Sequence, residues 1–113
     1  MKKFMALYMA PAATIRKMME NSTPEQTQAG MDEWMKWSNM HKDAVVDLGM
    51  PMGKTKRVAT SGVSNTSNDI TGYSIVSGDS LESVAKMFKD HPHLHMEGAT
   101  VDVLECMEMS EMM

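Results

Sequence analysis

Two segments near the ends of this chain alternate like β-strands but carry apolar side chains on both faces. Residues 3–9 place Phe4 on one face and Met5 and Leu7 on the other, because successive side chains of a strand point in opposite directions. Residues 99–109 repeat the pattern. An antiparallel sheet with one face in water normally alternates apolar with polar residues. A sheet built on these strands is therefore expected to bury both of its faces.

A capping box marks the start of a long helix. Thr23 and Gln26 can each accept a hydrogen bond from the other's backbone amide, and Pro24 suits the first helical position. Gly49 predicts the stop. A shorter helix is predicted over residues 11–21. The apolar stripe of the long helix keeps helical spacing and comprises Gly30, Trp34, Trp37, His41, Val45 and Leu48.

The remaining segments complete an α+β order. Strands are predicted over residues 54–60 and 70–76, with a polar turn region at 61–69 between them. Asp79, with Glu82 three residues later, predicts the start of another helix, which ends before Pro92 because proline cannot continue it. The order is that of the ferredoxin-like βαββαβ fold, in which both helices cover the same face of a four-stranded antiparallel sheet.

Helices on one face leave the other face of this sheet bare, although the first and last strands are apolar there too. Leaving several hundred Å² of apolar surface in water costs on the order of 10 kcal/mol, at roughly 25 cal/mol per Å². The same face of a second copy is the simplest cover, because a two-fold contact is self-complementary. We therefore expect a homodimer whose packed sheets form a shared core.

Composition excludes several classes of protein. The chain has 113 residues and a formal charge of −4, and its 16 methionines can fill core positions as leucine does. Neither nucleic acid nor a membrane is an expected partner, because basic residues are scattered and no apolar run reaches about 20 residues. Cys106 is the single cysteine and fits a reducing cytoplasm. We expect one domain over residues 1–109 and a short tail at 110–113.

Several short motifs, in their order and spacing, resemble those of the YCII-related family. They are Met1-Lys2-Lys3-Phe4-Met5, Thr23-Pro24-Glu25, Met31-x-x-Trp34-Met35-x-Trp37, Gly72-Tyr73-Ser74-Ile75, Asp79-Ser80-Leu81-Glu82, His91-Pro92-His93-Leu94 and Gly98-x-x-Val101-x-Val103. The resemblance covers residues 1–109 and implies a ferredoxin-like protomer in a dimeric α+β barrel. For some members it implies action on small, often aromatic, molecules through a helical His near an Asp that lies beside the proline of the last loop.

This chain departs from the family pattern at those positions. Gly30 stands where the resemblance places the helical His, and His91 stands where it places the acidic residue. Glycine has no side chain for acid–base chemistry, so the resemblance does not bring that pair to this chain. The Asp-Gly-Pro-Phe motif of one large branch is also absent. Within a helix glycine costs roughly 1 kcal/mol relative to alanine, and Gly30 is interpreted first as a close approach of helix to sheet and second as a pocket wall.

The leading functional hypothesis is a small-molecule pocket between helix and sheet. His91 is the candidate proton donor or general base, with a pKa near neutrality. Tyr8, Gly30, Trp34 and His93 are the candidate lining residues, whose aromatic rings would stack on a flat ligand. No cofactor is expected.

Two alternatives from other functional classes remain open. One is a lyase or isomerase acting on an aromatic-ring degradation product, with His91 as the base and Asp47 as an orienting acid. The other is a structural or regulatory subunit without a pocket.

Metal binding is weighed and not expected. His91, His93 and His95 would share one side of an extended segment, as metal ligands can, but no fourth ligand is specified. Methionine clusters beside Cys106 offer soft donors for Cu(I), yet methionine is spread through every predicted element, as a core filler would be.

Overall fold

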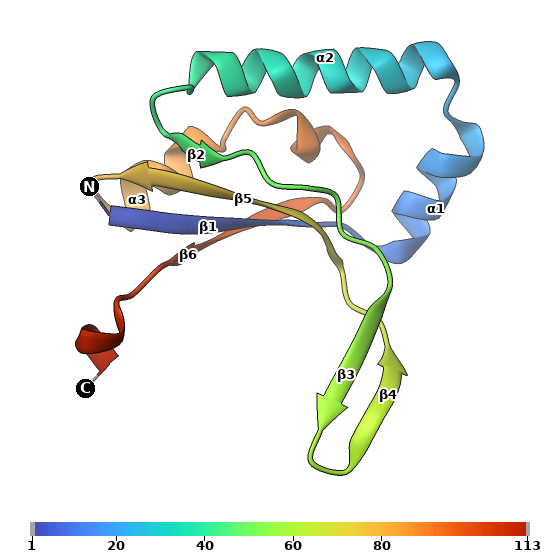
Figure 1. Cartoon of the computed structure of the whole chain (residues 1–113). Helices are drawn as coiled ribbons and strands as arrows, with labels where there is room; N and C mark the ends of the chain where they lie inside the picture. The colour runs from blue at the N-terminus through green and yellow to red at the C-terminus, as the bar shows by residue number, and fades with distance from the viewer. Residues whose placement is uncertain (1, 113) are drawn as a thin grey trace.

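The computed structural model of the chain describes residues 2–112 and has the expected α+β fold (Figure 1). Residues 1 and 113, the outer ends of the predicted domain and tail, lie outside the described part. An antiparallel sheet has the order β2-β5-β1-β6, with β1 and β5 at its centre. Its strands are β1 (Lys2–Met9), β2 (Val45–Asp47), β5 (Ile70–Gly78) and β6 (Thr100–Glu105). This connectivity is the ferredoxin-like one.

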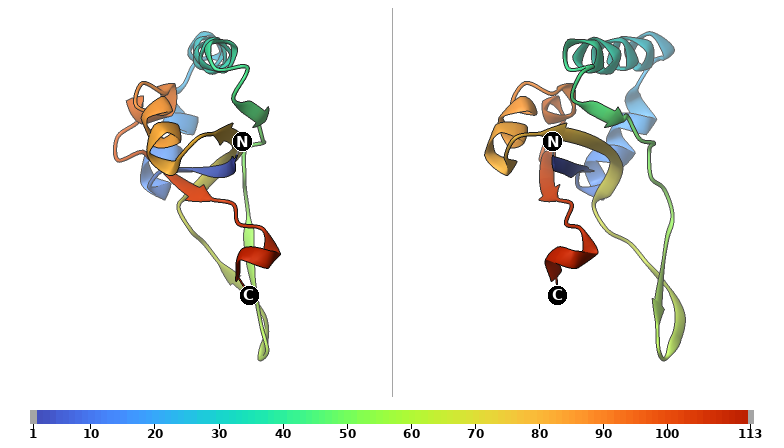
Figure 2. Two further views of the ribbon diagram at one scale, coloured as in Figure 1. Left: turned by 90° about the vertical axis from the view of Figure 1, so that its left-hand side faces the viewer. Right: turned by 60° about the vertical axis from the view of Figure 1, so that its left-hand side comes forward.

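Helical elements cover one face of this sheet. They are α1 (Ala12–Asn21), α2 (Pro24–Met40), α3 (Leu81–Met87) and the 3-10 turn η1 (Pro92–His95); a second 3-10 turn, η2 (Met109–Met112), lies in the C-terminal segment. Figure 2 shows α2 as the outermost element, with η1 between it and the sheet and α3 to one side of the strands. In the described residues, no helix combines the length and apolar character needed to cross a membrane.

The predicted capping box of α2 is confirmed, but the predicted end of the helix is wrong. The Thr23 hydroxyl accepts from the Gln26 amide at 3.2 Å, and the Gln26 side chain accepts from the Thr23 amide at 2.9 Å. The helix ends at Met40. Val45, expected on the helical stripe, instead pairs with Val76 of β5. β-branched residues favour strands, so the helical spacing of the last stripe positions was coincidental.

The fourth strand of the sheet is not the predicted one. The segment predicted over residues 54–60 forms β3 (Thr55–Ala59), which pairs with β4 (Gly62–Thr66) in a separate two-stranded sheet. The expected turn region at 61–69 therefore contains a strand. The three-residue β2 takes the edge position beside β5. Most residues of this hairpin are polar, and only Val58 and Val63 form an apolar pair on it, so little apolar surface requires a place in the main sheet.

Two further boundaries differ from expectation. The N-cap of α3 is Ser80 rather than Asp79, because the Ser80 and Ser83 hydroxyls accept from each other's amides at 3.1 and 3.2 Å. The last strand, expected to reach residue 109, ends at Glu105. From there the chain leaves the sheet and runs into η2.

The predicted alternation of the strands is confirmed by burial. On the helix side of the sheet, Phe4, Ala6 and Tyr8 of β1 are at most 1% exposed, and Val84 and Phe88 pack against them. On the other side, Leu7 and Ile75 are only partly covered and Leu104 is 46% exposed. We call this second side the open face. The chain thus has an apolar sheet surface that its own helices do not reach.

Two arms project from the sheet on the side of the open face (Figures 1 and 2). One arm is the β3–β4 hairpin, and the other is the C-terminal segment, residues 106–112. They make the chain more extended than usual: its radius of gyration is 15.9 Å, against about 13 Å for a compact domain of 100 residues. The accessible surface is 8476 Å², whereas a monomer of 12.6 kDa is expected to expose about 6,200 Å².

Candidate functional site

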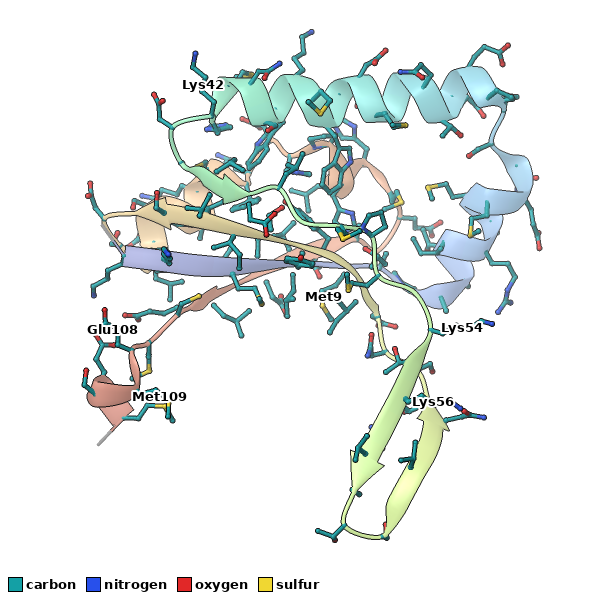
Figure 3. All side chains as sticks on the ribbon, viewed as in Figure 1. Met9, Lys42, Lys54, Lys56, Glu108 and Met109 are labelled. Carbon is teal, nitrogen blue, oxygen red and sulfur yellow. The ribbon has the colours of Figure 1, made fainter. Side chains whose placement is uncertain are left out.

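A cluster of rings fills the space between the sheet and α2. It contains four of the six predicted site residues, and Figure 3 shows the side chains gathered between α2 and the strands. Tyr8 comes from β1, Trp34 and Trp37 from α2, Phe88 from the end of α3, and His91 and His93 from the start of η1. We call these six residues the ring cluster.

His91 lies at the centre of the ring cluster and is fully buried. Its ring centroid lies 4.4 Å from that of Trp34, 4.5 Å from Trp37 and 5.0 Å from Tyr8. Pro92 follows it and begins η1, so the chain turns immediately after the imidazole. The predicted association of Tyr8, Trp34 and His93 with His91 is therefore realised in space.

The hydrogen bonding of His91 fixes its tautomer. Its Nδ1 accepts from the backbone N–H of His93 at 3.0 Å, so Nδ1 carries no proton. Burial, together with the charges that His93, His41 and His95 would carry, lowers the pKa of His91 from 6.5 to about 3. The ring is neutral at pH 7 and its proton lies on Nε2. The expectation of a pKa near neutrality is wrong, because it did not include the cost of burying an imidazolium.

The Nε2 atom of His91 has no hydrogen-bond partner among the described residues. A buried donor without an acceptor costs about 1–3 kcal/mol. The protein therefore presents a buried N–H group among aromatic rings.

His93 ties the ring cluster to the end of β1. Its Nε2 donates to the carbonyl oxygen of Met9 at 2.8 Å. Burial lowers the pKa of His93, and backbone hydrogen bonds to Met9 and Thr100 oppose that shift. The imidazole is 3% exposed and has a partner, so it holds η1 in place against the sheet.

Tyr8 begins a short chain of hydroxyl hydrogen bonds. The Ser74 hydroxyl donates to the carbonyl oxygen of Leu48 at 2.6 Å, so the Tyr8 hydroxyl donates to Ser74 at 2.9 Å. Burial raises the pKa of Tyr8. Ser74 was not predicted as a site residue, although it is a polar residue on the inward face of a strand, which was the available signal.

Trp37 and Phe88 are the other ring-cluster residues that the sequence did not assign to the site. Trp37 is 5% exposed and its Nε1 donates to the carbonyl oxygen of Met87 at 3.3 Å. Both residues belong to predicted apolar stripes, but a stripe position does not tell a core ring from a site ring.

Gly30 lies one turn before Trp34 on α2. A Cβ atom built on it would meet no other atom within 4 Å. The interpretation of Gly30 as a close approach of helix to sheet is therefore wrong. The position that a Cβ atom of residue 30 would occupy is open space.

Asp47 lies outside the ring cluster. It belongs to the edge strand β2 and is exposed, and its Oδ1 accepts from the Gly49 amide at 2.9 Å. The Asp47 carboxylate thus bonds to the turn that follows β2 and does not join the buried ring of His91.

The three histidines of the last loop do not share one side, as an extended segment would require. Residues 92–95 form the turn η1, and His95 is exposed, with its Nδ1 3.6 Å from a Glu33 oxygen. Within residues 2–112, no three His, Cys, Asp or Glu side chains converge as metal ligands would.

Surface concavities lie away from the ring cluster. One, of about 630 Å³, is bounded by residues 53–56 and 65–68 at the base of the hairpin. Another, of about 330 Å³, runs along residues 32–39 on the outer side of α2. Neither concavity is lined by a residue of the ring cluster.

Comparison with known proteins gives a distant likeness to a solved structure. No family model and no curated protein matches the chain. Among solved structures, the chain is similar to 5-chloro-2-hydroxyhydroquinone dehydrochlorinase from Burkholderia phenoliruptrix in complex with 2,5-dihydroxybenzoquinone, with a TM-score of 0.47 and 12% identity over 88% of this chain and 90% of that one. A likeness this remote says nothing about activity, so the function has to be argued from the ring cluster.

Proposed function

We propose that this protein is a homodimeric, cytoplasmic binding protein for a small planar molecule, whose acceptor atom takes the hydrogen bond of His91 Nε2. The buried, unpartnered N–H group is the observation that carries the proposal. An oxygen of the ligand would satisfy this donor, and the surrounding aromatic rings would supply stacking contacts. YCII-related membership is part of the same proposal and rests on the motifs quoted above.

Trp34 is the side chain that would move to admit the ligand. It is half-buried, whereas the other members of the ring cluster are buried. Gly30 leaves open space one turn away on the same helix. Rotation of the indole toward that space would expose His91 and leave Trp37 as the anchor of α2.

The tautomer favours a donor role for His91 over the role of a base. A base needs a free lone pair, but the Nδ1 lone pair accepts from His93 and Nε2 carries the proton. The lyase or isomerase alternative would therefore require the other tautomer and the loss of the His93 hydrogen bond. Asp47 would also have to leave Gly49 to orient the ring.

Close packing favours a second candidate function, a structural or regulatory subunit without a pocket. The ring centroids of Trp34 and Trp37 lie 4.4 and 4.5 Å from that of His91, and the two concavities described above lie elsewhere. In that case the unpartnered N–H group destabilises the core, and no ligand compensates for it.

Binding of benzoate, a planar ring with acceptor oxygens, separates the two candidates. Tryptophan fluorescence of the wild-type protein should change saturably with benzoate, because Trp34 and Trp37 flank the site. His91→Phe keeps an aromatic ring but removes the donor, and it should weaken binding by about tenfold, the equivalent of one hydrogen bond. Native mass spectrometry of the purified protein would also detect a co-purified ligand.

The opposite result supports the subunit without a pocket. In that case benzoate leaves the fluorescence unchanged and no ligand co-purifies. His91→Phe then has about the same stability as the wild type, because it removes the unsatisfied Nε2 donor but also the Nδ1 acceptor of the His93 amide.

A further inference from the structure

Among the described residues, no third strand pairs with the β3–β4 hairpin. Its strands form a sheet separate from the main one and project into solvent (Figure 1). An isolated two-stranded hairpin is at best marginally stable in water and needs a surface to pack on. An arm of this shape therefore implies a contact outside its own protomer.

An apolar pair on the hairpin marks where that contact would be made. Val58 lies directly opposite Val63 in the strand pairing, so both side chains are on one side of the hairpin. They are 78% and 67% exposed. The hairpin also carries Lys54, Lys56 and Arg57, which make it basic on a chain of net negative charge.

The other arm has complementary properties. The C-terminal segment carries Glu108 and Glu111, together with Met107 and Met109, which are 54% and 78% exposed. Figure 3 shows Lys54 and Lys56 on the hairpin and Glu108 and Met109 on the C-terminal segment, well separated within the protomer. A basic, apolar arm and an acidic, apolar arm thus flank the same open face.

The two arms leave opposite ends of the central strands. The hairpin precedes Ile70, which pairs with the last residue of β1, Met9. The C-terminal segment follows Glu105, which pairs with Phe4 near the start of β1. A two-fold axis that crosses the strands between two facing sheets exchanges these ends. It brings the hairpin of each copy to the C-terminal segment of the other.

We infer that the β3–β4 hairpin of each copy clasps the C-terminal segment of a second copy across the open face. This inference rests on the proposed homodimer and adds the contact that orients it. The accessible surface of 8476 Å² exceeds the monomer expectation by roughly 2,300 Å². Two copies together have enough surplus for the 2,000–5,000 Å² or so that obligate homodimers bury, and the arms supply part of it.

A charge exchange between the arms tests the contact. The full-length variant Lys54→Glu/Lys56→Glu should raise the dimer dissociation constant about tenfold at low salt, since several weak ion pairs are lost twice in a symmetric dimer. Glu108→Lys/Glu111→Lys should do the same. All four substitutions together should restore the constant to within about threefold of the wild type, because the attraction is re-formed with opposite sign. Lys42→Glu, on the helix side (Figure 3), is the matched control and should have no effect.

A second variant tests the apolar part of the clasp. Val58→Thr/Val63→Thr keeps β-branched side chains and all charges, so the hairpin can still form. It should also weaken the dimer, by about tenfold, because apolar contacts are lost. Sedimentation velocity over a range of protein concentrations measures every constant.

The outcomes separate this inference from the homodimer itself. A wild-type protein that is monomeric at low micromolar concentration overturns both. If the hairpin variants have the same dimer dissociation constant as the wild type, the clasp is wrong and the sheet-to-sheet dimer remains. Weakening by each charge reversal without rescue in the combined variant places the hairpin against another part of the partner and also overturns the clasp.

Discussion

His91 shows how far a single residue could be understood from the sequence. Its neighbours Tyr8, Trp34 and His93 were predicted, because each sits at a recognisable position of a strand, helix or loop. Its ionisation was not predicted, since the pKa depends on burial by rings from four different elements. Gly30 was misread for a related reason: sequence shows that a side chain is missing but not whether the space is filled.

The lowered pKa of His91 predicts a loss of stability in acid. The unfolded chain binds the proton near pH 6.5, but the folded protein binds it only near pH 3. Stability therefore falls as pH drops through this window, by up to about 1.4 kcal/mol per pH unit. His93, whose pKa is also lowered, acts in the same direction. Urea unfolding at about pH 7, 5.5 and 4.5, values that lie within or just above this window, should show the fall in stability.

His91→Phe is the control for this acid sensitivity. A phenyl ring keeps the packing and cannot be protonated, so the variant should lose distinctly less stability between the highest and lowest of those pH values. An equal loss in both proteins would mean that His91 is not the group responsible.

At the scale of elements, local signals were reliable and long-range pairing was not. The start of α2 was predicted because a capping box is complete within four residues. The edge strand β2 was missed because three residues give no readable period, and its first residue, Val45, happened to continue the helical stripe. The hairpin was assigned to the main sheet because sequence alone does not show which strands pair. The element order survived these errors, since β2 simply replaces β3 as the second strand.

Gly49 connects β2 to the rest of the chain and predicts a strong effect of substitution. Its φ is +81°, a region that L residues rarely adopt, and a Cβ atom would overlap the carbonyl oxygen of Tyr73. Gly49→Ala should destabilise the protein by at least about 2 kcal/mol, since left-handed strain and the overlap both contribute. Gly53→Ala is the matched control, because its Cβ would meet nothing within 4 Å. Equal midpoints of urea unfolding for the two variants would argue against this account.

At the scale of the whole molecule, the sequence predicted that the sheet is apolar on both faces, but it did not predict the two arms. Alternation within a strand is a local property, so the two apolar faces of β1 could be seen without knowing any partner strand. The arms could not, because their separation from the sheet depends on which strands pair. The open face and the two arms each contribute to the surplus of accessible surface, and they lie on the same side of the molecule.

Leu7→Glu tests whether the open face is an interface. Leu7 lies near the middle of the central strand β1, between Tyr73 and Asp102 on the neighbouring strands. In a monomer its side chain borders water, so a carboxylate there should be tolerated. In a sheet-to-sheet dimer the carboxylate would be buried against its own copy, and burying an unpaired charge costs several kcal/mol. Sedimentation velocity should show a monomer whose circular dichroism matches that of the wild type. A Leu7→Glu protein that remains dimeric would show that the open face is not where the copies meet.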